Sequence, residues 1–109
     1  MAVRAHIQEK HIIEYSAGSH FTGSAQEAIG DWMTSNGIYI VGQDTDEWEI
    51  EKTELRRLRE SKAAFDDEEV DDIAELLCKP LDDTRQDLRE FLEELINSDT
   101  GEYAYVSWF

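Results

Sequence analysis

The sequence predicts a single α+β domain in which an antiparallel or mixed sheet of four to five strands packs against three to four helices. Three observations favour this class. The chain has 109 residues, which suits one domain and leaves no room for two ordinary ones. Period-two hydrophobic patterns occur near both ends and around residue 48, with helical patterns between them. The apolar fraction of 40% is sufficient for a core, so a wholly disordered chain is not expected.

Residues 2–15 predict β-structure. Val3, Ala5 and Ile7 alternate with polar residues, a pattern typical of a half-buried strand. Residues 11–15 form a second strand or continue the first, and residues 8–10 make a poor hairpin turn. The sequence therefore leaves open whether this segment is one strand or a hairpin. Residues 16–23 contain two glycines and predict a loop.

A first helix is predicted to begin at Ser24 and to end at Asn36-Gly37, whose residues tolerate a left-handed backbone. Ser24 and Glu27 have the spacing of a capping box, in which each side chain bonds a free backbone N–H at the start of the helix. The apolar stripe of this helix consists of Ala25, Ala28, Ile29, Trp32 and Met33.

Residues 38–51 predict a β-hairpin. Residues 38–41 are apolar on both faces, which is typical of a central strand. Residues 42–46 have turn chemistry. In residues 47–51, Trp48 and Ile50 alternate with glutamates, so one face of this strand is expected to meet solvent. A short helix should follow over residues 54–62, with Leu55 and Leu58 on its inner side.

Residues 66–97 predict an acidic helical segment of two helices, which Pro80 separates. Asp66 is expected to cap the first helix, with Glu69 at capping-box spacing, and Asp82 or Asp83 to cap the second. The predicted buried stripes are Val70, Ile73, Ala74 and Leu77 in the first helix, and Leu88, Phe91, Leu92, Leu95 and Ile96 in the second.

Residues 103–109 predict a final strand that is rich in aromatic side chains. We expect this strand to lie inside the sheet, because a frayed tail would leave its rings exposed to water.

The charge of the chain is its most informative feature. The formal net charge is −16, from 26 acidic and 10 basic side chains. Residues 1–65 hold 11 acids and 7 bases, whereas residues 66–109 hold 15 acids and only 3 bases. This balance argues against a surface that neutralises nucleic-acid phosphates and against attraction to anionic lipid. We therefore expect no direct nucleic-acid partner and no membrane partner.

The acidic segment predicts a docking surface for a basic protein. Residues 66–75 carry seven carboxylates and no base. Acids near a helix amino end are favourable, but like charges four residues apart cost a helix a few tenths of a kcal/mol. The alternative interpretation is a solvated helix face that serves only solubility. The residues assigned to partner binding are Asp67, Glu68, Asp71, Asp72, Glu75, Asp83, Asp87, Glu90 and Glu94.

A narrower hypothesis is that these carboxylates imitate nucleic acid and occupy a groove shaped for phosphates. Small phage and mobile-element inhibitors of nucleases and restriction enzymes are often acidic in this way; the similarity is one of composition and involves no family motif. The alternative function is a structural or assembly protein that self-associates through its sheet or its aromatic last strand. A monomer and a homodimer both stay open.

The basic island, defined as Arg56, Arg57, Arg59 and Lys62, has two interpretations. Its members pair with acids of the same chain, which lowers self-repulsion, or they meet the acidic face of a second copy. We expect the first, because it requires no further partner.

No catalytic signature, metal site or cofactor motif is recognised, so we expect a non-enzymatic protein without metal or cofactor. The three histidines, His6, His11 and His20, lack the spacing of a zinc site. The single cysteine, Cys78, is expected to be a small buried hydrophobe. A lone cysteine suits a reducing compartment, and residues 1–10 lack the apolar run of a secretory signal, so a cytoplasmic location is expected.

Overall fold

The structure, a computed structural model, describes residues 5–10, 14–15 and 23–108. Two short 3-10 turns accompany the helices, η1 over Gly23–Ala25 and η2 over Ala63–Phe65. The helices are α1 (Gln26–Ser35), α2 (Lys52–Glu60), α3 (Asp67–Leu77) and α4 (Leu81–Asn97). The strands are β1 (Ala5–Lys10), β2 (Glu14–Tyr15), β3 (Ile40–Val41), β4 (Glu47–Glu51) and β5 (Tyr103–Trp108).

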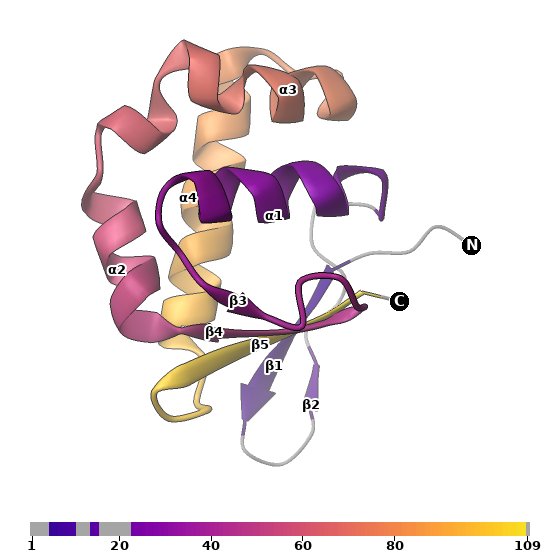
Figure 1. Ribbon diagram of the computed structural model, residues 1–109, viewed down its shortest axis with the longest axis vertical. Helices are drawn as coiled ribbons and strands as arrows, with labels where there is room; N and C mark the ends of the chain where they lie inside the picture. The colour runs from indigo at the N-terminus through magenta and orange to yellow at the C-terminus, as the bar shows by residue number, and fades with distance from the viewer. Residues whose placement is uncertain (1–4, 11–13, 16–22, 109) are drawn as a thin grey trace.

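The described strands form one antiparallel sheet in the order β2-β1-β5-β4-β3. The three longer strands, β1, β5 and β4, make up its centre, and the two-residue strands β2 and β3 extend it on either side. The α-helices lie together on one side of this sheet (Figure 1). The predicted α+β class is confirmed, with one antiparallel sheet and, within the described residues, four α-helices.

Two expectations about strands are resolved at the ends of the chain. β1 and β2 are separate strands that pair antiparallel, with Gln8 opposite Tyr15, so the segment is paired as in a hairpin rather than extended as one strand. β5 lies between β1 and β4, which confirms the prediction that the last strand is inside the sheet. Val3, residues 11–13, most of the predicted loop (16–22) and Phe109 lie outside the described residues.

The prediction of a central strand over residues 38–41 is wrong. β3 comprises only Ile40 and Val41 and pairs with β4 alone among the described strands. Ile40 packs inward, whereas Tyr39 is 76% exposed and Val41 is 42% exposed. The strand ends at Gly42, whose φ of +78° begins the turn; a Cβ atom there would lie 2.5 Å from the Glu47 carbonyl oxygen. A four-residue apolar run thus forms a short edge strand.

The helices lie near their predicted positions, but their caps differ. The 3-10 turn η1 precedes α1, so Ala25 rather than Ser24 is the N-cap residue. Asp66 is the N-cap residue of α3 as predicted, although its side chain makes no capping hydrogen bond. Pro80 is the N-cap residue of α4, which places Asp82 and Asp83 in the first turn. Pro80 is extended, with a ψ of 155°, and its carbonyl oxygen accepts the Thr84 N–H at 3.0 Å, so α4 begins at Leu81, before either aspartate.

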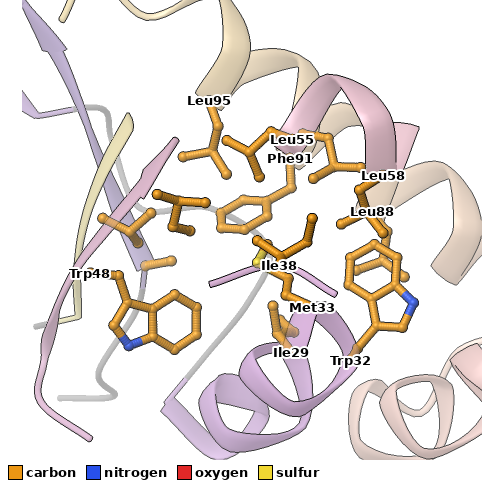
Figure 2. Close-up of a cluster of buried hydrophobic side chains, with 14 of the residues drawn as sticks. Ile29, Trp32, Met33, Ile38, Trp48, Leu55, Leu58, Leu88, Phe91 and Leu95 are labelled. Carbon is orange, nitrogen blue, oxygen red and sulfur yellow. The ribbon is translucent and has the colours of Figure 1, made fainter. Parts of the chain in front are cut away.

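The predicted apolar stripes meet in one core between the helices and the inner face of the sheet. Figure 2 shows that Phe91 and Leu95 of α4 point toward Trp48 and Ile29, from β4 and α1. The rings of Trp48 and Trp108 pack edge to face with centroids 5.0 Å apart. The fully buried large side chains are Trp48, Ile7, Ile29, Met33, Ile50, Leu55, Leu58, Ile73, Leu88, Leu92 and Leu95.

Candidate functional site

Helices α1 and α3 lie side by side (Figure 1). Contacts of the Trp32 side chain hold the two helices together. The Trp32 indole N–H donates to the Ala64 carbonyl oxygen at 2.7 Å. The same ring packs edge to face on Phe65, with centroids 5.6 Å apart. Because Ala64 and Phe65 belong to the turn η2 that leads into α3, these contacts anchor α1 to the start of the neighbouring helix.

A groove of about 660 Å³ runs between the two helices, and we call it the α1–α3 groove. Its apolar lining comes from Ala28 and Trp32 of α1 and from Ile73 and Leu76 of α3. Trp32 and Ile73 are buried, but Leu76 is 46% exposed. The groove therefore has an apolar floor that rests on core residues and an exposed leucine at its edge.

The walls of the α1–α3 groove are acidic on both sides. Its exposed carboxylates are Glu27 and Asp31 on α1, and Glu68, Glu69, Asp72 and Glu75 on α3. Among the residues that the structure describes, no basic residue lines the groove and none of these six side chains forms an ion pair. Low-dielectric walls that carry charge of one sign concentrate the field and attract cations.

Three of the nine residues predicted for partner binding lie in this groove: Glu68, Asp72 and Glu75. Glu27 and Asp31, which were not predicted, also line the groove; they are four residues apart on α1 and so share one side of that helix. That spacing is visible in the sequence, but nothing local indicates that α1 faces α3. Glu69 lies in the acidic run and lines the groove, although it was not predicted to bind the partner.

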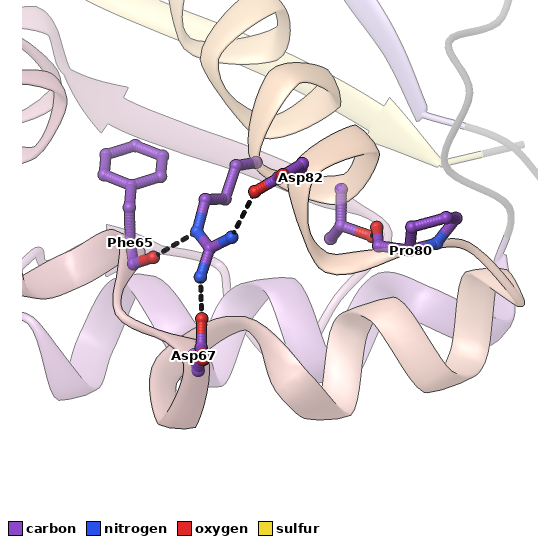
Figure 3. A network of polar contacts seen from close by, with 6 residues as sticks. Phe65, Asp67, Pro80 and Asp82 are labelled. Carbon is purple, nitrogen blue, oxygen red and sulfur yellow. Dashed lines mark hydrogen bonds and ion pairs between the residues drawn. The ribbon is translucent and has the colours of Figure 1, made fainter.

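Two predicted residues are neutralised within the fold. Asp67 pairs with the guanidinium of Arg85, which also donates to the Phe65 carbonyl oxygen at 2.6 Å and to Asp82 at 2.7 Å (Figure 3). Asp87 is 9% exposed and pairs with the Lys79 ammonium at 2.6 Å. Asp87 was predicted to bind the partner, but its carboxylate is largely buried and points to Lys79.

The other predicted residues are exposed but lie outside the groove. Asp71 is on α3, and Asp83 is in the first turn of α4. Glu90 and Glu94 line a shallow hollow along α4 together with Arg85 and Arg89. Arg89 lies over the Phe65 ring at 4.4 Å from its centroid. The surface of α4 thus carries mixed charge, whereas the α1–α3 groove is acidic.

The basic island is partly paired within the chain, as expected. Arg59 contacts Glu93 of α4 at 2.8 Å and Glu60 at 3.2 Å, and Arg57 pairs with Glu54. Arg56 and Lys62 form no ion pair among the residues that the structure describes.

Two shifted pKa values occur at the sheet end of the molecule. Burial, assisted by the nearby charge of Arg56, lowers the pKa of Lys52, whose ammonium donates to the Ser98 carbonyl oxygen. Burial raises the pKa of Tyr105, and the negative charge of Glu49 raises it further. The Tyr105 hydroxyl donates to the Glu49 carboxylate at 3.3 Å. Both groups lie outside the α1–α3 groove.

Among the described residues, the remaining reactive side chains do not converge on a metal site. Cys78 is exposed, so the expectation that it is buried is wrong. His11, His20 and the side chain of His6 lie outside the described residues. Across residues 5–10, 14–15 and 23–108, no group of three or more His, Cys, Asp or Glu is placed to hold a metal ion. In the same ranges, no helix has both the length and the apolar character needed to cross a membrane.

Comparison with known proteins adds no relative to this description. No family model, no curated protein and no solved structure matches the chain.

Proposed function

We propose that the protein is a small, non-enzymatic cytoplasmic binding protein that docks on a basic protein surface. The observation that carries the proposal is the α1–α3 groove, whose two walls present six unpaired carboxylates above an apolar floor within the described residues. The paired residues Asp67 and Asp87 are left out of the proposed site. Glu27, Asp31 and Glu69 are added to it.

Electrostatic attraction would guide and hold the partner. Carboxylates that stand together on helices repel one another, by a few tenths of a kcal/mol for each pair one turn apart. A cationic partner would relieve that repulsion. The carboxylates would therefore stabilise the complex with the partner and not the free protein. Because these side chains are exposed, the interaction should weaken as salt shortens the Debye length from about 30 Å at 0.01 M to about 8 Å at 0.15 M.

The test uses an oligoarginine peptide as the cationic probe, titrated by calorimetry at low and at moderate salt. We expect the affinity to fall by about tenfold over this range, as for other exposed charge pairs. The triple variant Glu68→Gln, Asp72→Asn, Glu75→Gln should lose a similar factor at low salt. The control variant Asp44→Asn, Asp46→Asn, Glu102→Gln removes the same number of exposed charges elsewhere and should bind nearly as the parent does.

Two results would contradict the proposal. Binding that is insensitive to salt would exclude an electrostatic mechanism. Equal losses in the groove variant and in the control variant would show that only the total charge matters, as in the solubility interpretation.

A narrower form of the proposal is that the partner's basic surface normally holds DNA or RNA, as it would for an inhibitor encoded by a phage or a mobile element. It is supported by the net charge of −16 alone. Its test is competition: the protein should release a short duplex from a basic nucleic-acid-binding protein, and the groove variant should not.

The alternative, self-association, has one supporting observation. Tyr39, which precedes β3, and the strand residues Val41 and Tyr103 are exposed. β5 itself pairs on both edges, so its backbone offers no free edge to a second copy. A dimer that persists at high salt in light scattering would favour this alternative.

A further inference from the structure

We propose that the element held in the α1–α3 groove is an amphipathic α-helix of another protein, with basic side chains on both flanks of an apolar stripe. This inference rests on the proposed function and specifies the chemistry and the shape of the partner. It is carried by three features of the groove: its two charged walls, its apolar floor, and the exposed Leu76 at its edge.

The charges on each wall repeat once per helical turn. Glu27 and Asp31 are four residues apart on α1; Glu68, Asp72 and Glu75 are four and three apart on α3. Residues at such spacings lie on one side of a helix. A partner helix along the groove would carry its own lysines and arginines at the same spacings on both flanks. Charges of one sign that repeat with the helical period therefore fit a helix with positive charges at the same period better than they fit a single cation.

The floor of the groove calls for an apolar occupant. Leu76 is 46% exposed, whereas Val70, Ile73 and Ala74 of the same helix are buried. A hydrated cation or a purely basic peptide would leave Leu76 and the rim of the floor in contact with water. An apolar stripe with the helical period would cover them, which is the usual way in which grooves between helices bind amphipathic segments.

The groove is about as long as a short partner helix. Helix α1 has 10 residues and α3 has 11 residues, so each spans about 15 Å at 1.5 Å per residue. That length accommodates about three turns, enough for an apolar stripe with flanking charges on both sides.

A second copy of this chain does not supply such a helix within the described residues. Helix α2 carries the three arginines of the basic island, but its apolar residues Leu55 and Leu58 are buried in its own core. Its charge would match the groove, but it has no exposed apolar stripe for the floor. The occupant is therefore assigned to another chain.

The concave shape also distinguishes this partner from a nucleic-acid-binding groove. Duplex phosphates project outward from a convex surface into a protein cleft. Here carboxylates line both walls of a concave groove. Such a groove can hold a helix of the partner, but it cannot itself project into a cleft of the partner. A helix inserted into the groove contacts both walls at once.

The experiment compares two peptides of the same composition, each about 14 residues of leucine, lysine and alanine. In one peptide the leucines form a helical stripe with lysines on both flanks; in the other the order is scrambled so that no stripe exists. Affinity is measured by calorimetry at low salt, and helix formation by circular dichroism. We expect the amphipathic peptide to bind about tenfold more tightly and to become helical on binding.

The variant Leu76→Ala tests the floor without altering charge, and the exposure of Leu76 means that the fold should tolerate it. It should weaken binding of the amphipathic peptide by about fivefold, which is the effect on affinity expected from losing the burial of roughly half a leucine side chain. Binding of the scrambled peptide should stay within about twofold of its parent value, because that peptide places no stripe over Leu76.

Each outcome separates the inference from the proposed function. Equal affinities for the two peptides, both lost in the variant Glu68→Gln, Asp72→Asn, Glu75→Gln, would overturn the helix and leave the acidic docking function in place. Binding of the amphipathic peptide that does not respond to Leu76→Ala would likewise overturn it. Failure of both peptides to bind at low salt would overturn the inference and the proposed function together.

Discussion

At the scale of single residues, Arg85 removes a carboxylate from the acidic surface while it builds the fold. Its guanidinium contacts Phe65, Asp67 and Asp82, which belong to η2, to the first turn of α3 and to the first turn of α4. The Arg85 side chain is only 17% exposed and its bond to the Phe65 carbonyl oxygen is partly buried, whereas the Asp67 and Asp82 carboxylates are exposed. Arg85 therefore joins three segments of the fold. It also neutralises Asp67, which the charge pattern of the sequence predicts to bind the partner.

Replacing Arg85 by methionine keeps most of the apolar stem and removes the donors. We expect Arg85→Met to lower the free energy of unfolding by about 1–3 kcal/mol, because the Phe65 carbonyl and two carboxylates lose a charged donor. Urea unfolding measures the change. Arg56→Met is the matched control: Arg56 is exposed and forms no ion pair among the described residues, so its loss should change stability by less than about 0.5 kcal/mol. Equal effects would refute the role given to Arg85.

Tyr105 should make the stability of the protein fall at alkaline pH. Its pKa in the folded state is raised above the ordinary value of 10.0, first by burial and then by the charge of Glu49. The unfolded chain therefore releases this proton at lower pH than the folded chain. Stability that Tyr105 contributes is complete below about pH 10 and is lost as the pH rises through the folded pKa.

A difference titration tests this shift directly. The phenolate absorbance of the parent minus that of Tyr105→Phe should rise at a higher pH than in the unfolded chain. Glu49→Gln should lower the midpoint only in part, because burial is the larger cause. A midpoint at or below the ordinary tyrosine value would show that the assignment is wrong.

Among the elements, α3 ends in a turn whose conformation the sequence did not predict. The chain leaves α3 through Cys78, whose φ is +55°, a left-handed conformation that glycine usually adopts. The Cys78 N–H donates to the Glu75 carbonyl and the Lys79 N–H to the Ala74 carbonyl, at 3.2 and 3.1 Å. These two bonds have the pattern of a Schellman motif, which closes the helix before Pro80.

The variant Cys78→Gly should stabilise the protein. Glycine removes the strain of a left-handed side-chain-bearing residue, about 1–2 kcal/mol, and loses part of that gain to the greater freedom of the unfolded chain. We expect a net increase of about 0.5–1 kcal/mol in the free energy of unfolding, measured in urea. Cys78→Ala, which keeps a Cβ atom, should lie within about 0.5 kcal/mol of the parent. A less stable glycine variant would contradict the argument.

At the scale of the whole molecule, the acidic surface divides into two regions of different character. The α1–α3 groove holds carboxylates that lack ion pairs within the described chain, whereas α4 presents its acids beside Arg85, Arg89 and Lys79. The uneven charge of the sequence is thus also uneven in space. Groups that are suited to binding a cation should, for the same reason, oppose folding when no cation is bound.

Neutralising part of the groove should therefore stabilise the free protein. Asp72→Asn with Glu75→Gln removes like-charge pairs from the middle and end of α3, where acids gain nothing from the helix dipole. We expect a gain of about 0.5–1 kcal/mol at low salt, which shrinks at high salt as screening weakens the repulsion in the parent. Urea unfolding at two ionic strengths measures both effects. A loss of stability at low salt would contradict the picture of an unpaired acidic groove.

Features that depend on neighbours along the chain could be predicted from the amino-acid sequence. Helical stripes such as Leu88 to Ile96, the alternation around Trp48 and the turn at Gly42 all appear as predicted, because each rests on local periodicity or on local backbone preference. The aromatic last strand was placed inside the sheet because burial of its side chains requires it.

Which carboxylates face a common groove and which are paired depends on long-range packing. The contacts that matter join residues far apart in the chain: Glu27 lies across the groove from the acids of α3, and Arg85 reaches Asp67 from the next helix. Residues 38–41 illustrate the same limit: among the described strands β3 pairs only with β4, so a run with the pattern of a central strand forms an edge strand. The local sequence pattern predicts whether a segment is a helix or a strand. Which other elements it packs against depends on how the apolar faces of all elements are buried together.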